Sequence, residues 1–89
     1  MSKSQNPVAI ITGGSRGVGK ATALLLASKG WNVTITCTNS LKAAELVVEQ
    51  CKSLGVEALS VIADVSDNHA CLETVEQCFL KWGRVDCLI

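Results

Sequence analysis

The 89-residue sequence lacks several features that would place it in common functional classes. No apolar run approaches the ~20 residues of a membrane-spanning helix, so we expect no membrane span. Eight basic residues balance eight acidic ones, which gives no reason to expect a nucleic-acid partner. The first six residues are polar and contain no signal-peptide core. We therefore expect a cytoplasmic protein.

Metal-binding patterns are also missing. The chain has one histidine and no C-x-x-C pair, so a zinc site is not expected. Its cysteines are odd in number and widely spaced, which favours reduced thiols that pack as small hydrophobic side chains. They are Cys37, Cys51, Cys71, Cys78 and Cys87.

A glycine-rich stretch near the N-terminus is the most informative feature that is present. It runs from Thr12 to Gly19 as T-G-G-S-R-G-V-G, after the apolar run 8–11 and before a run of good helix formers. This order predicts a strand, a tight turn and a helix whose N-terminus offers unpaired N–H groups to an anion. Glycine suits the turn because it adopts positive φ and lets a phosphate approach the backbone. A dinucleotide diphosphate is the expected guest.

Strand and helix patterns alternate along the rest of the chain. We expect strands at 8–11, 32–37, 57–63 and 85–89, and helices at 18–29 and 41–54. A third helix is expected to begin at a cap formed by Ser66 or Asp67 and to end at Gly83. This alternation predicts an α/β fold, a doubly wound Rossmann-type parallel sheet with strand order 3-2-1-4. The glycine turn then lies at the switch point where such sheets bind ligands.

Apolar spacing also predicts which face of each helix is buried. The expected buried faces are Ala21, Leu24, Leu25 and Ser28 in the first helix, Ala44, Val47, Val48, Cys51 and Leu54 in the second, and Leu72, Val75, Phe79 and Trp82 in the third.

The spacing T-G-x-x-x-G-x-G resembles the short-chain dehydrogenase/reductase family, most closely its 3-oxoacyl-carrier-protein reductase and glucose-dehydrogenase-like members. The resemblance covers residues 7–89. Two alternatives remain open. One is a P-loop, which the stretch 14–21 nearly matches, but Ala21 stands where a hydroxyl would hold Mg²⁺. The other is a glycine-rich turn without a ligand.

The resemblance implies a nicotinamide cofactor and the residues that bind it. NAD-type sites carry an acidic residue in this part of the chain, which binds the ribose 2′-OH and would repel a 2′-phosphate. No acidic residue lies between Gly19 and Glu45, so the sequence permits a 2′-phosphate. Arg16 is the expected cation for that phosphate, and NADP is favoured over NAD. Asp64 and Val65 match the family's pair at the adenine. The expected cofactor-binding residues are Gly13, Ser15, Arg16, Gly17, Val18, Gly19, Thr38, Asp64 and Val65.

Some polar residues have a simpler structural explanation. Asp64 could instead cap the following helix, although Asp67 fits that role better. His69 is expected on the solvated surface, and Asp86 is expected to be structural.

The family's catalytic residues, a Ser and a Tyr-x-x-x-Lys pair, are not found in this sequence, which contains no tyrosine. We therefore expect residues 1–89 to be the N-terminal, NAD(P)-binding part of a single Rossmann domain, truncated after its fourth strand and inactive alone. The resemblance implies an oxidoreductase that interconverts a carbonyl and a secondary alcohol, with a small-molecule or acyl-thioester substrate and a homo-oligomeric full-length form. The alternative is a non-catalytic dinucleotide-binding module complete at this length.

Overall fold

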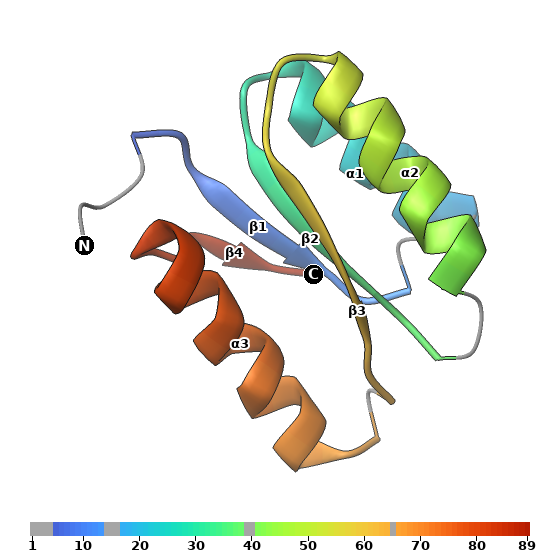
Figure 1. Ribbon diagram of the computed structural model, residues 1–89, viewed down its shortest axis with the longest axis vertical. Helices are drawn as coiled ribbons and strands as arrows, with labels where there is room; N and C mark the ends of the chain where they lie inside the picture. Colours follow the sequence, from blue (N-terminus) through green and yellow to red (C-terminus); the bar gives the residue numbers. More distant parts are fainter. Residues whose placement is uncertain (1–4, 14–16, 39–40, 65) are drawn as a thin grey trace.

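The computed structural model describes residues 5–13, 17–38, 41–64 and 66–89. Four parallel strands form one sheet in the order β3-β2-β1-β4, which confirms the predicted order (Figure 1). The elements in chain order are β1 (Val8–Ile11), α1 (Gly17–Ser28), β2 (Asn32–Cys37), α2 (Leu41–Ser53), β3 (Ala58–Ile62), α3 (Asn68–Trp82) and β4 (Cys87–Leu88).

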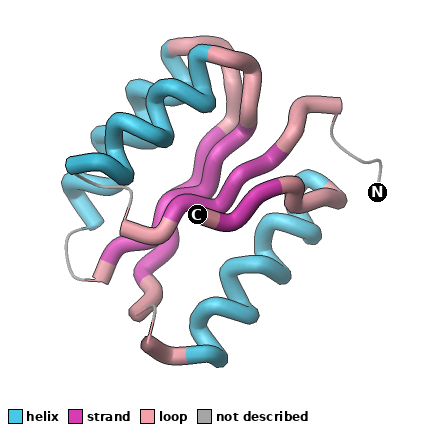
Figure 2. The backbone as a smooth tube through the Cα atoms, turned by 180° about the vertical axis from the view of Figure 1, so that it is seen from behind, coloured by secondary structure: helices cyan, strands magenta, loops and turns pink. Residues whose placement is uncertain are grey.

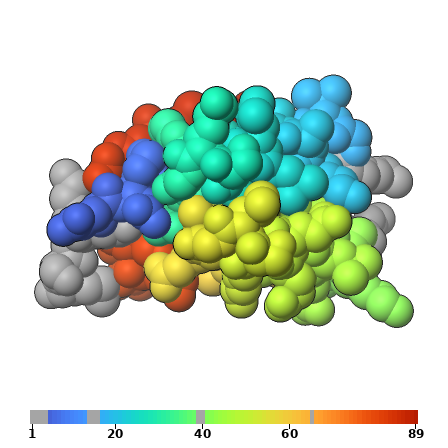
Figure 3. Space-filling view, turned by 90° about the horizontal axis from the view of Figure 1, so that it is seen from above, coloured from blue at the N-terminus to red at the C-terminus, as the bar shows by residue number. Residues whose placement is uncertain are grey.

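The helices lie on both faces of the sheet. Helices α1 and α2 cover one face and α3 covers the other (Figures 1 and 2). The central strands β1 and β2 are buried along their whole length, as expected for parallel strands covered on both sides. The segments that follow α1 and α2 lie side by side at one end of the molecule (Figure 3), where the Val33 N–H donates to the Glu57 carbonyl.

The predicted ends of the third helix are confirmed. Asp67 is the N-cap of α3, because its side chain accepts from the N–H groups of His69 and Ala70. Gly83 follows the helix with φ 73° and donates its N–H to the Phe79 carbonyl. The last strand is shorter than expected, although N–H donation from Ile89 to Ile10 continues its pairing with β1.

The predicted buried face of α1 is mostly wrong, because only Leu24 of its four residues packs against the core. Ala23 and Ala27 are buried, whereas Ala21, Leu25 and Ser28 are exposed. The helix is apolar around most of its circumference, so hydrophobic spacing alone does not mark one face. The two alanines are small enough for the helix to lie close to the sheet and α2, Leu24 and Leu26 pack beside them, and Leu25 is exposed.

The predicted face of α3 is partly wrong. Trp82 is buried, but Leu72 and Phe79 are exposed, and Thr74 and Cys78 are buried in their place. Thr74 donates its hydroxyl to the Ala70 carbonyl of its own helix, so its burial leaves no polar atom unpaired.

The α2 prediction holds for Ala44, Val47, Val48 and Cys51, but Leu54 lies beyond the helix and is half exposed. None of the helices in the described ranges is long and apolar enough to cross a membrane.

Candidate functional site

The glycine turn connects the end of β1 to the start of α1. Gly13 and Gly17 have φ values of 69° and 63°, in the left-handed region that glycine adopts without strain. Apart from the neighbouring backbone, no atom of the described residues lies within 4 Å of the position that a Cβ would take at either residue. The Gly13 N–H donates to the Thr36 hydroxyl on β2 at 3.2 Å, which ties the turn to the neighbouring strand. The expected residues Ser15 and Arg16 lie outside the described part of the chain.

Helix α1 begins at this edge of the sheet, and helix geometry leaves the first N–H groups of α1 without partners inside the helix. The helix begins at Gly17 and carries no acidic residue in its first turn. The positive end of the helix dipole is therefore not offset by a carboxylate of that turn, and an anion is favoured there. The Val18 side chain is 83% exposed, and Gly19 adds no side chain.

Asp64 occupies the corresponding edge position after β3. Its Oδ1 accepts from the Ser66 N–H at 2.9 Å and from the Ser66 hydroxyl at 2.8 Å. The backbone hydrogen bond, followed by the hydroxyl bond, lowers the pKa of the Asp64 carboxyl. Its Oδ2 has no hydrogen-bond partner among the described residues. Because Asp67 caps α3, the cap interpretation of Asp64 is wrong, and Asp64 presents an ionised, oriented acceptor.

A pocket of about 210 Å³ lies between the carboxyl ends of the strands and α3. Sequence spacing does not reveal it, because its wall combines strand ends with one face of α3. Thr12 on its rim donates its hydroxyl to the Ile89 carbonyl at 2.9 Å, which joins the ends of β1 and β4. The wall is mainly apolar and consists of Ile10, Thr12, Thr36, Ala63, Cys71, Val75, Leu88 and Ile89.

Six of the nine expected binding residues are described, and all lie at or next to the carboxyl ends of β1, β2 and β3. They are Gly13, Gly17, Val18, Gly19, Thr38 and Asp64. Thr38 is exposed directly after β2. Val65, like Ser15 and Arg16, is outside the described residues.

The remaining polar residues agree with their structural interpretation. The Asp86 carboxylate accepts from the Val8 N–H at 2.8 Å and pairs with Arg84, at the opposite ends of β1 and β4. His69 is a surface residue that pairs with Glu73 at 2.8 Å. Among the described residues, no group of three or more histidine, cysteine, aspartate or glutamate side chains could hold a metal ion.

Comparison with known proteins identifies the family and excludes the P-loop alternative. The profile of the short chain dehydrogenase family matches residues 7–89. The chain belongs to this family. It is 38% identical over 84 residues to a 3-oxoacyl-[acyl-carrier-protein] reductase of Staphylococcus epidermidis, a match that covers 94% of this chain and 34% of the relative. It is 40% identical over 91 residues to the versicolorin reductase of Emericella nidulans, covering 97% and 34% of the two chains.

Solved structures of dehydrogenases superpose well on the chain. A short chain dehydrogenase from Burkholderia cenocepacia in complex with NADP gives a TM-score of 0.90 at 37% identity, covering 98% of this chain and 36% of that one. An NAD⁺-bound xylitol dehydrogenase gives 0.85 at 33% identity, covering 92% and 31%. This family member thus spans about a third of the length of these relatives.

Proposed function

We propose that residues 1–89 form the cofactor-binding part of an NADP-dependent oxidoreductase that interconverts a carbonyl and a secondary alcohol. The observation that carries the proposal is the glycine turn, with two positive-φ glycines and an uncompensated helix N-terminus at the switch point of the sheet. Membership of the family supports the same conclusion.

In this proposal the backbone N–H groups of Gly17, Val18 and Gly19 bind the diphosphate. The space where Cβ atoms of Gly13 and Gly17 would lie is open, so a phosphate can approach the main chain there. A bound nicotinamide would donate hydride in its reduced form or accept it in its oxidised form, and the described residues would bind and orient the cofactor.

Asp64 is proposed to accept a hydrogen bond from the adenine amino group through its open Oδ2, with Val65 against the ring. The lowered pKa keeps this carboxylate ionised at neutral pH, which strengthens it as an acceptor. Ala63, the preceding residue, lines the apolar pocket, so a ring beside Asp64 would have apolar surface nearby.

The preference for NADP over NAD rests on charge at the end of β2. The sequence places no carboxylate between Gly19 and Glu45 that would repel a 2′-phosphate. We propose that Arg16 pairs with this phosphate and that the Thr38 hydroxyl donates to it. One similar structure contains NADP and another NAD⁺, so the test must compare both cofactors.

The catalytic groups are proposed to lie outside residues 1–89, in a longer enzyme. The relatives are about three times as long, and this sequence has no tyrosine. We propose a small-molecule or acyl-thioester substrate, a homo-oligomer and a cytoplasmic location for that enzyme. The 89 residues alone are expected to bind cofactor without reducing a carbonyl.

Calorimetric titration of the 89-residue chain with NADPH, NADH and ATP-Mg tests the proposal. We expect NADPH to bind most tightly and ATP-Mg least. Gly19→Asp should abolish NADPH binding, because a carboxylate would meet the diphosphate. The same carboxylate favours the first turn of a helix, so thermal stability should not fall. Unchanged NADPH affinity in this variant would refute the proposed turn.

Arg16→Ala tests the cofactor preference separately. It should weaken NADPH by about 1–3 kcal/mol through loss of a charge-assisted contact, and NADH much less. An equal loss for both cofactors would contradict the proposed contact with the 2′-phosphate.

A further inference from the structure

A buried hydroxyl group on β2 supports the glycine turn from inside the sheet. Thr36 is the next-to-last residue of β2, and its side chain is only 3% exposed. Its Oγ1 accepts a hydrogen bond from the Gly13 N–H at 3.2 Å. A buried polar side chain needs a partner, and here the partner is the main chain of the turn.

This hydrogen bond takes the place of a main-chain bond between β1 and β2. The Asn32 N–H donates to the Pro7 carbonyl, and the two strands keep one register over the whole of β1. Parallel ladders repeat every two residues, so a continued ladder would pair the Gly13 N–H with the main-chain carbonyl of Thr36. The Gly13 N–H bonds to the Thr36 hydroxyl instead, and the chain leaves the sheet at Gly13 with φ 69°.

The side-chain acceptor restricts the conformation of the turn. Glycine adopts positive and negative φ about equally readily, so Gly13 alone does not fix the direction in which the chain leaves β1. Thr36 is β-branched, and its χ1 angle is therefore restricted. A hydrogen bond to this stiff, buried side chain favours the observed turn before any ligand binds.

We propose that Thr36 is a positioning residue for the cofactor, because its hydroxyl holds the glycine turn in the conformation that receives the diphosphate. The inference rests on the proposed function, since it assigns a role to a residue behind the proposed diphosphate site. A turn that is ordered in advance raises affinity, because less conformational freedom is lost on binding.

The same strand provides a matched control. Thr34 lies two residues earlier on β2, has its side chain on the same face and is fully buried. Its hydroxyl lies 3.0 Å from the Cys78 sulfur on α3, which is not part of the turn. Valine at either position replaces a hydroxyl with a methyl group of similar size, but only Thr36→Val removes the acceptor of the Gly13 N–H.

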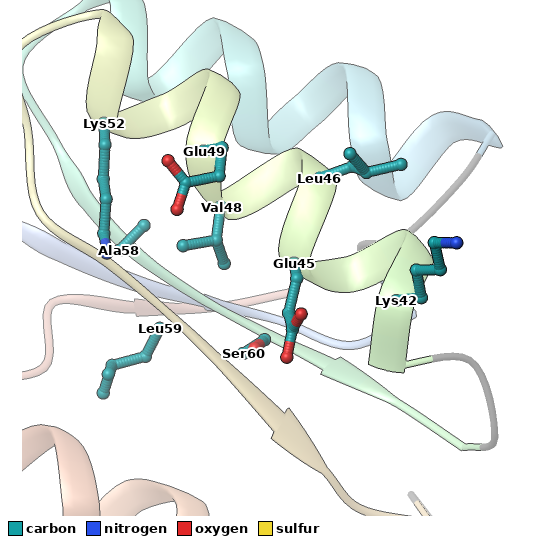
Figure 4. A pocket seen from close by; sticks show the side chains of 9 residues that line it. All are labelled: Lys42, Glu45, Leu46, Val48, Glu49, Lys52, Ala58, Leu59 and Ser60. Atoms are coloured by element: carbon teal, nitrogen blue, oxygen red, sulfur yellow. The ribbon is translucent and has the colours of Figure 1, made fainter.

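A second control lies in a groove on the flank of the molecule, between α2 and β3. The groove has a volume of about 470 Å³, and Ser60 on β3 is one of its lining residues (Figure 4). None of the lining residues belongs to the glycine turn or to β2. Ser60→Ala therefore removes a hydroxyl from the sheet at a place that the proposed cofactor site does not include.

Calorimetric titration of the 89-residue chain and its variants with NADPH tests the inference. We expect Thr36→Val to weaken NADPH binding about fivefold, because one neutral hydrogen bond supports the turn. Thr36→Ser keeps the hydroxyl and should restore the affinity of the parent chain. Thr34→Val and Ser60→Ala should bind NADPH as the parent chain does.

Amide hydrogen exchange without cofactor separates positioning from a direct contact between Thr36 and the cofactor. Thr36 also lines the pocket of about 210 Å³, so affinity alone does not distinguish the two roles. Gly13 is exposed, so water can pair with its N–H in Thr36→Val, and the melting temperature should change little. The Gly13 amide should exchange about fivefold faster in Thr36→Val than in the parent chain or Thr36→Ser, while the amides of β1 and β2 keep their rates.

The possible failures of the inference and of the proposed function are distinct. Parent-like NADPH affinity in Thr36→Val, an unchanged Gly13 exchange rate in that variant, or no rescue by Thr36→Ser would overturn the inference alone. Absence of NADPH binding by the parent chain would overturn the proposed function, and the role of Thr36 with it.

Discussion

Two glycines with positive φ lie at the two ends of α1. Substituting each in turn separates the effect of the glycine turn on cofactor binding from its effect on stability. Gly17 lies at the start of the helix with φ 63°, and Gly30 lies after its end with φ 90°. At both residues, the position that an alanine Cβ would take has no described atom within 4 Å apart from the neighbouring backbone. The expected penalty for alanine at either position therefore comes from its backbone conformation.

The magnitude follows from that conformation. An L-residue in the left-handed region costs about 1–2 kcal/mol, and alanine recovers about 0.4–1 kcal/mol by restricting the unfolded chain. We expect Gly17→Ala and Gly30→Ala each to lower the free energy of unfolding by about 1 kcal/mol. For a domain of this size, that corresponds to a fall in Tm of about 4–8 °C.

The two variants should differ in cofactor binding. A methyl group at Gly17 would occupy the open space where the diphosphate is proposed to approach, whereas Gly30 lies at the opposite end of α1. Melting followed by tryptophan fluorescence and calorimetric titration with NADPH would measure both properties. We expect at least a tenfold loss of NADPH affinity for Gly17→Ala and little change for Gly30→Ala. Equal affinities in variants of equal stability would refute the proposed path of the diphosphate.

Three further predictions concern a helix cap, a titrating group and a sheet edge. Asp67→Ala should destabilise the chain by about 1 kcal/mol in urea unfolding, because it removes the side-chain acceptor at the start of α3. The Asp64 pKa is lowered below 3.8 in the folded chain, so the carboxylate contributes to stability above pH 3.8 and loses this contribution as the pH falls through the folded-state pKa. Ser66→Ala should raise the Asp64 pKa in an NMR titration. An unchanged pKa would contradict the assigned hydrogen bond. The Leu88 side chain is 64% exposed on an edge strand, so Leu88→Lys should raise the concentration at which light scattering detects self-association. The charge-matched control is Leu25→Lys, because the Leu25 side chain is 56% exposed on α1. This control should leave that concentration unchanged.

Much of the fold could be predicted because its signals are local. Alternating β-branched residues mark β2, and Asp67 and Gly83 mark the ends of α3 through side-chain and backbone capping. Family resemblance and the right-handed crossover rule then give the strand order without any long-range information. The carboxyl ends of the strands consequently carry the proposed binding residues on the same edge.

The failures have a different physical origin. In α1, apolar side chains surround the helix, and only the close approach of α2 and the sheet selects Ala23 and Ala27 for burial. In α3, Thr74 is polar by residue type, but its hydroxyl bonds to its own helix and its methyl group can be buried. The Thr34 hydroxyl lies 3.0 Å from the Cys78 sulfur, and this contact joins residues far apart in the sequence. Such tertiary pairings select the buried face, and hydrophobic spacing does not contain them.

The two edges of the sheet differ in the side chains that surround them. Near β4, the exposed large side chains are apolar, and they include Leu88 and Ile89 beside the carboxyl edge. Near β3, Ile62 is also exposed, but charged side chains of α2 without a partner among the described residues border the strand. An exposed apolar edge pairs with other chains with little selectivity, whereas charges beside an edge oppose unselective pairing. We therefore infer that further protein covers the β4 side of the sheet.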